Sequence, residues 1–266
     1  MREAAPGGGD GRPTVVLYNP RAVFFTMPLA LVAIGSHLDP ARYRVVIVDG
    51  RLEADPEAAV AAAVGGGDAV CLAVTVLTGA PIRDAVAVSR AAKRRRPDLP
   101  VVWGGWHPSM FALECLDEPA VDVTVQGQGE ETFAEVVERL VAGDALDGCA
   151  GCSFRAADGT PRQNPPRPFA AVDGFRRHDF GLLDVEAFFR LKGRRQLDYV
   201  SSQGCPFRCA FCADPFVYRR KWSGLPPERI GEEVEDLWRR HRFADLSFQD
   251  ETFFTYAPRV EAVGGG

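Results

Sequence analysis

The chain has 266 residues, of which 46% are hydrophobic and 25% charged, and its formal net charge is −5 at pH 7. This composition is ordinary for a globular protein, and its scattered basic residues form no basic face of the kind that binds nucleic acid. The most apolar stretch, residues 22–35, contains Pro28 and is shorter than the roughly 20 residues of a membrane-spanning helix, so no transmembrane segment is predicted.

The N-terminal residues 1–12, MREAAPGGGDGR, are glycine-rich and are predicted to be disordered. They lack the basic-then-apolar pattern of a secretory signal. The seven cysteines are odd in number and unevenly clustered, which does not fit a disulfide framework. We therefore expect a reducing, cytoplasmic setting, in which a tight cysteine group serves metal binding or catalysis.

Short apolar runs alternate with helical patterns over residues 13–150. The runs end at Gly, Asp, Thr or Pro, as strands buried on both faces do, and they cover residues 14–20, 43–50, 69–75, 100–105 and 121–127. The helices are predicted over residues 29–38, 56–65, 80–96, 110–116 and 130–142, and the last has acids in its first turn and a glycine after its end. This alternation predicts an α/β fold with a doubly wound parallel sheet.

Three neighbouring strand ends carry residues suited to a ligand, in the sequences TVLTG, GGWHPS and GQGEE. Ligands of open α/β sheets bind beyond the carboxyl ends of the strands, and glycine lets the backbone approach them closely. A single glycine after a strand usually serves only to form a turn. A lone histidine such as His107 more often packs a loop than binds a ligand. Together the three ends predict one broad ligand across the top of the sheet, with candidate contacts Thr75, Thr78, Gly104, Gly105, His107, Gly127, Gly129 and Glu130.

The middle of the chain is predicted to connect two domains. Cys149 and Cys152 form a C-x2-C without a second pair nearby, in a stretch typical of a strand and turn, and are interpreted as structural. Residues 158–169 are rich in proline and polar side chains, and residues 182–195 are predicted to form an amphipathic helix or an extended cover. We therefore divide the chain into a disordered N-terminus (1–12), a sheet domain (13–150), a linker (151–195) and a second domain (196–266).

The second domain contains three closely spaced cysteines, Cys205, Cys209 and Cys212, in a C-x3-C-x2-C pattern. They lie on a loop that follows a strand predicted at 197–203 and precedes a helix predicted at 226–242 and a strand predicted at 244–254. Barrel enzymes have their catalytic residues on such loops, at the carboxyl ends of their strands. Three thiolates on a four-iron cluster leave one iron open, as catalytic zinc keeps an open position. Structural zinc is the alternative, and its nearest fourth ligand would be His241.

The stretch CPFRCAFC resembles the signature of the radical S-adenosylmethionine (SAM) superfamily, including the aromatic Phe211 directly before the last cysteine. The resemblance implies that the three cysteines hold a [4Fe-4S] cluster and that SAM chelates its open iron. Reductive cleavage of SAM then yields a 5′-deoxyadenosyl radical, with electrons from a reductase or flavodoxin-type donor. The implied SAM contacts are Phe211 near the adenine and, in FQDETFF, Gln249, Asp250 and Glu251 near the amino group.

The sheet domain resembles the flavodoxin-like cobalamin-binding domain that precedes the radical SAM core in a large subgroup. This resemblance rests on TVLTG, GGWH and GQGE, where Gln128 replaces the first acid of the usual G-E-G-E. The two resemblances together cover roughly residues 13–260. It implies that the strand-end candidates listed above contact cobalamin. No histidine follows an aspartate by two positions, so the D-x-H-x-x-G motif that supplies a cobalt ligand is absent.

In that subgroup the common reaction is methylation of an unactivated carbon. One SAM methylates the cobalamin, a second generates the radical, and methylcobalamin delivers the methyl group. The stretches FRLKGRRQLDYVSSQGC and CADPFVY are similar to those of hopanoid methylases, which implies a small-molecule or lipid substrate. Radical cyclisation or rearrangement with the same cofactors, and a non-catalytic cobalamin- or metal-binding fragment, are the alternatives. Because few units of the radical SAM barrel are present, we expect the chain to be the first part of a longer enzyme.

Overall fold

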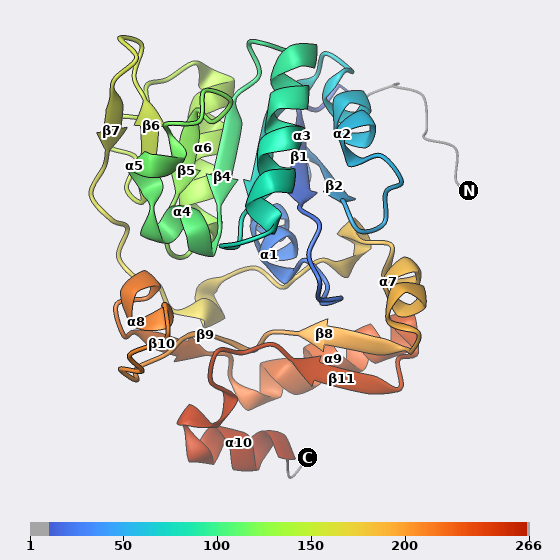
Figure 1. Cartoon of the computed structure of the whole chain (residues 1–266). Coiled ribbons are helices and arrows are strands. Elements are labelled where there is room, and N and C mark those ends of the chain that lie inside the picture. Colours follow the sequence, from blue (N-terminus) through green and yellow to red (C-terminus); the bar gives the residue numbers. More distant parts are fainter. Residues whose placement is uncertain (1–10, 265–266) are drawn as a thin grey trace.

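The computed structural model describes residues 11–264, so all but the last two residues of the N-terminal segment predicted to be disordered lie outside the described residues. A sheet domain built around strands β1–β7 faces a smaller C-terminal part, residues 185–264 (Figure 1). Within the described residues, no helix has the length and apolar character needed to cross a membrane.

The sheet domain contains a seven-stranded sheet in the order β2-β1-β3-β4-β5-β6-β7. Five strands are parallel and match the predicted ones, namely β1 (Thr14–Asn19), β2 (Arg44–Asp49), β3 (Ala69–Thr75), β4 (Val101–Gly104) and β5 (Val123–Val125). Two antiparallel strands, β6 (Cys152–Arg155) and β7 (Pro161–Gln163), extend one edge. The parallel part has the flavodoxin-like order, whose ligand crevice opens between β1 and β3.

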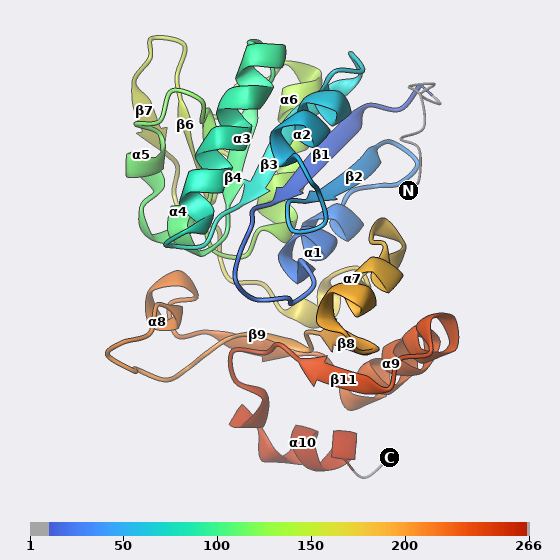
Figure 2. The ribbon, with the colours of Figure 1, turned by 45° about the vertical axis from the view of Figure 1, so that its right-hand side comes forward.

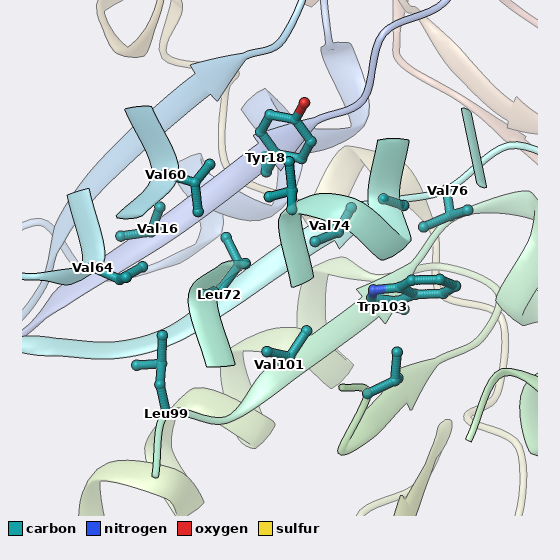
Figure 3. Packing of buried hydrophobic residues seen from close by; sticks show 14 of the residues in the cluster. Val16, Tyr18, Val60, Val64, Leu72, Val74, Val76, Leu99, Val101 and Trp103 are labelled. Carbon is teal, nitrogen blue, oxygen red and sulfur yellow. The ribbon is translucent and has the colours of Figure 1, made fainter. Parts of the chain in front are cut away.

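Helices cover both faces of this sheet because successive strand residues point to opposite sides. Val16 and Tyr18 of β1 pack with α2 (Pro56–Val64) and α3 (Pro81–Arg95), as Figure 3 shows, whereas Val15 and Leu17 pack with α1 (Leu29–His37) and α6 (Glu130–Ala142). The helix predicted at 110–116 is instead two short helices, α4 (Trp106–Met110) and α5 (Ala112–Cys115), because Phe111 leaves the helical conformation with φ −131°.

The C-terminal part forms two small sheets rather than one. β8 (Gln196–Tyr199) pairs in parallel with β11 (Asp245–Phe248), and β9 (Ser202–Gly204) pairs antiparallel with β10 (Trp222–Gly224). The strand predicted at 197–203 is therefore broken after Tyr199, and the strand predicted at 244–254 ends at Phe248. The cysteine loop between β9 and β10 contains one short helix, α8 (Asp214–Val217).

A third apolar cluster supports these strands. Tyr199 and Leu197 pack against α7 (Val185–Lys192) and α9 (Pro227–His241), close to the helices predicted at 182–195 and 226–242. The remaining elements are η1 (Val172–Gly174), η2 (Phe180–Leu182), η3 (Phe253–Thr255) and α10 (Ala257–Gly264). The domain boundary at residue 150 stays a prediction, although β6 and β7, which follow it, pair with the sheet.

Candidate cofactor site

A cavity of about 310 Å³ lies where the carboxyl ends of the parallel strands face the C-terminal part. Thr75, Gly104 and Gly127 line it from the sheet, and Gln203 and Glu251 line it from the opposite side. The cavity thus lies where a doubly wound sheet is expected to have its ligand crevice. This crevice faces the elements next to the cysteine loop.

Glycine turns form part of the sheet wall of the cavity. Gly105 has φ +95°, and a β-carbon there would lie 3.0 Å from Thr75 Oγ1 and 3.1 Å from Val76 N. Gly127 also has a positive φ, +71°. Only glycine adopts such conformations readily, so these turns keep the strand ends free of bulky side chains.

Six of the eight residues predicted to contact a ligand on the sheet line this cavity, namely Thr75, Gly104, Gly105, Gly127, Gly129 and Glu130. The other two, Thr78 and His107, do not line it and instead lie together, with 3.2 Å between Thr78 Oγ1 and His107 Nδ1. Partial burial lowers the pKa of His107. His107 lies in α4 with its ring against that of Phe111 (5.2 Å between ring centroids), and its contact with a ligand, like that of Thr78, stays a prediction.

The loop between β1 and α1, residues 20–28, forms an apolar wall of the cavity that the sequence patterns did not predict. Figure 2 shows this loop, in dark blue, reaching from the end of β1 toward the C-terminal part. Phe24 and Met27 line the cavity from it. Arg51 Nη1 donates to the Phe24 carbonyl (2.8 Å) and Arg51 Nη2 to Asp49 Oδ2 (2.6 Å), so a buried ion pair holds the loop. The crevice between β1 and β3 was the signal that could have identified it.

The three cysteines of the C-x3-C-x2-C pattern lie on the loop between β9 and α8. Cys205 is buried, Cys212 is half-buried and Cys209 is exposed; Cys212 N donates to the Cys209 carbonyl (3.1 Å). The Cys212 thiol donates to Asp214 Oδ2 (3.4 Å). Phe211 is 93% exposed and does not line the cavity.

The donor set of this loop suits an iron–sulfur cluster. No three or more His, Cys, Asp or Glu side chains among residues 11–264 converge as they would on a single metal ion. A four-iron cluster engages each thiolate through a different iron, so its ligands need not converge on one point. His241, the fourth ligand that zinc would need, lies at the end of α9 beside Arg195 and Glu186. Three thiols without a histidine therefore fit a cluster better than zinc.

The residues at the end of β11 divide into two kinds. Gln249 and Glu251 line the cavity, whereas Asp250 points into the protein. Asp250 accepts hydrogen bonds from Ser201 N (2.8 Å), Ser201 Oγ (2.7 Å) and Ser202 Oγ (2.5 Å), and lies 3.9 Å from the buried Arg259 guanidinium. Its carboxylate is thus fully engaged in holding the turn after β8.

Two carboxyl groups that line the cavity, those of Glu251 and Glu130, have raised pKa values. Burial raises the pKa of Glu251 to about 7, and its Oε2 accepts from Gly204 N (3.2 Å). Glu130, the first residue of α6, is 4% exposed, and burial raises its pKa as well. At a pKa of about 7, Glu251 can hold a proton near neutral pH, where an unperturbed carboxyl group is ionised.

Residues 17–137, which belong to the sheet domain, match the family of B12 binding domains. The chain is 32% identical over 231 residues to an uncharacterized methyltransferase of Pyrococcus horikoshii, covering 85% of this chain and 49% of the relative. It is 26% identical over 261 residues to the hopanoid C-3 methylase of Methylococcus capsulatus, covering 95% of this chain and 47% of that protein. The chain thus spans about half the length of these relatives.

Solved structures share the fold over almost the whole chain. The radical SAM methyltransferase TsrM of Kitasatospora setae, solved with tryptophan and a SAM analogue, has a TM-score of 0.80 and 19% identity, covering 94% of this chain and 50% of that one. OxsB, a cobalamin-dependent radical SAM enzyme solved with aqua-cobalamin and SAM, has a TM-score of 0.78 and 18% identity, covering 95% and 36%. The predicted fold, a doubly wound sheet followed by the start of a radical SAM core, is confirmed.

Proposed function

We propose that this chain, which belongs to the radical SAM proteins that carry a cobalamin-binding domain, is the cofactor-binding part of an enzyme that transfers methyl groups to unactivated carbon. One observation carries the proposal. One cavity has walls from the strand ends of the B12-type domain, from Gln203 in β9, the strand before the cysteine loop, and from Glu251 after β11. Two cofactors in such an arrangement would face each other and a common substrate.

In this proposal Cys205, Cys209 and Cys212 bind a [4Fe-4S] cluster, and cobalamin lies over Thr75, Gly104, Gly105, Gly127, Gly129 and Glu130. When bound, the cluster and SAM supply a radical that abstracts hydrogen, and cobalamin supplies the methyl group. The glycine turns support the proposal because they admit a broad ligand close to the backbone. Thr78 and His107 keep only a peripheral role in it.

The SAM contacts in this proposal come from the cavity side of β11. Gln249 and Glu251 face the cavity and can meet polar groups of SAM, whereas Asp250 shapes the turn that supports them. Phe211, exposed on the cysteine loop, would cover the adenine once SAM is present. A buried Glu251 that titrates near neutral pH can adapt its charge to an amino group.

The proposal extends to the whole enzyme. Its substrate is a small molecule or a lipid, since the hopanoid C-3 methylase is among the relatives. Its electrons come from a reductase or flavodoxin-type donor, and it works in the cytoplasm. Radical cyclisation with the same cofactors is a second candidate, favoured by 27% identity over 160 residues to the anaerobic magnesium-protoporphyrin IX monomethyl ester cyclase of Synechocystis.

The products of SAM test the proposal. The chain is reconstituted anaerobically with iron, sulfide and hydroxocobalamin, and SAM and dithionite are added. Methyl transfer predicts both S-adenosylhomocysteine, stoichiometric with bound corrinoid, and 5′-deoxyadenosine. Cyclase chemistry predicts 5′-deoxyadenosine alone. Formation of neither product by protein that retains iron and corrinoid would contradict an enzymatic role for this part of the chain.

A further inference from the structure

Gln203 joins the cysteine loop to the sheet domain through both ends of its side-chain amide. It lies in β9, two residues before Cys205. Its Nε2 donates to Glu130 Oε1 (2.5 Å), and its Oε1 accepts from Gln128 Nε2 (2.9 Å). These two partners belong to the GQGE turn at the end of β5, so one amide bridges the two walls of the cavity.

The sheet end of this bridge is held firmly. Gln128 Oε1 accepts from Ala170 N (2.7 Å), and Gln128 Nε2 also donates to the Ala170 carbonyl (3.1 Å). Glu130 is nearly fully buried, and without Gln203 its carboxyl would lose the one side-chain donor that the structure gives it. An unpaired buried carboxyl is costly, so the turn and β9 hold each other in place.

The end of the bridge that leads to Cys205 is also held by a hydrogen bond. Gly204 N donates to Glu251 Oε2 (3.2 Å), and Gly204 has φ +83°. The backbone between Gln203 and Cys205 is therefore fixed on both sides. A movement of the GQGE turn would be passed through Gln203 to the first cluster ligand.

We infer that Gln203 is a positioning residue that couples the two cofactor sites, so that corrinoid in the cavity and iron on the cysteine loop strengthen each other's binding. This inference rests on the proposed function. A corrinoid lying on the GQGE turn would order Gln128 and Glu130, and these order β9 through Gln203. Because coupling between sites is reciprocal, a cluster must tighten corrinoid binding by the same factor.

The test is the affinity for hydroxocobalamin, measured by equilibrium dialysis on cluster-loaded and cluster-free chain. The ratio of the two dissociation constants is expected to be about fivefold or more in the wild type. Gln203→Ala is expected to bring this ratio near one, whatever it does to the cluster-free affinity, because the ratio compares two states of the same variant. Gln163→Ala, which removes an exposed amide on β7, is the control and should keep the ratio.

Exchanging the amide of Gln203 and the carboxyl of Glu130 distinguishes a loss of coupling from general damage to the fold. Gln203→Glu faces Glu130 with a second carboxylate and should abolish the ratio, whereas Gln203→Glu with Glu130→Gln restores a donor–acceptor pair and should recover it. A wild-type ratio near one, or a double variant no better than Gln203→Glu, would overturn the inference while leaving the proposed function standing. Absence of both iron and corrinoid binding would overturn the proposed function and this inference with it.

Discussion

Gly204 packs directly on the backbone carbonyl of Lys221: a β-carbon on Gly204 would lie 2.3 Å from that oxygen. The two residues flank the cysteine loop, since Gly204 precedes Cys205 and pairs with Trp222, the residue after Lys221. With φ +83°, Gly204 also has a backbone conformation that other residues rarely adopt. The base of the loop that carries the three cysteines is therefore closed by a contact that only glycine allows.

Gly204→Ala is expected to open this base. The clash is with backbone, which cannot move aside as a flexible side chain can, so we expect a loss of more than about 2 kcal/mol in the free energy of unfolding. Urea denaturation measures it. Gly231→Ala is the control, because Gly231 lies in α9 with open space around it and should gain up to about 1 kcal/mol. Equal effects of the two substitutions would contradict the contact.

Asp250→Ala is expected to destabilise the fold itself. It removes the acceptor of three hydrogen bonds and leaves the buried Arg259 without its nearby carboxylate, at a cost of about 3–5 kcal/mol. Thermal or urea unfolding of the cofactor-free chain measures this loss. Asp245→Ala, at the exposed start of β11, should stay within about 0.5 kcal/mol of wild type. A stable Asp250→Ala chain that fails only to bind SAM would instead assign Asp250 to the cofactor.

Glu251 makes the stability of the chain depend on pH. Burial raises the pKa of Glu251 from 4.5 to about 7 in the folded chain. Its contribution to stability is therefore fully present below pH 4.5 and is lost as the pH rises through 7, because the folded chain must then hold a charged carboxylate.

Glu251→Gln removes that dependence. Relative to wild type, the variant should gain about 1–3 kcal/mol in the free energy of unfolding between pH 5 and pH 8, measured with urea on the cofactor-free chain. Glu53→Gln, at an exposed position, is the control and should differ from wild type by the same small amount at both pH values. A constant difference for Glu251→Gln would show that the carboxyl is charged throughout this range.

The parallel sheet could be predicted because its signal is local. Strands such as Ala69–Thr75 are apolar on both faces, and this pattern is visible in a single short run. The breaks in other elements depend on distant partners. Only two residues separate β8 from β9, but β8 pairs with β11 and β9 with β10, and nothing in the sequence LDYVSSQ itself marks this break.

In the candidate site, too, some features can be read from local sequence and others depend on distant residues. Glycines at strand ends and closely spaced cysteines are readable from the sequence because each motif needs only its own neighbours. The roles of Gln203 and Asp250 cannot be read in this way, since their side-chain hydrogen bonds connect them to residues at least 48 positions away in the sequence. The apolar loop over the cavity was missed because Phe24 and Met27 have no pattern that separates a cavity wall from core.

The central claim, that one chain holds an iron–sulfur cluster and a corrinoid on facing walls, is tested most directly by metal analysis and visible absorption after anaerobic reconstitution. We predict about four irons per chain together with retained corrinoid. Cys209→Ala should lose the iron, and Cys115→Ala, a buried cysteine on α5, should keep it. Zinc in place of iron, iron that survives Cys209→Ala, or absence of corrinoid would contradict the account.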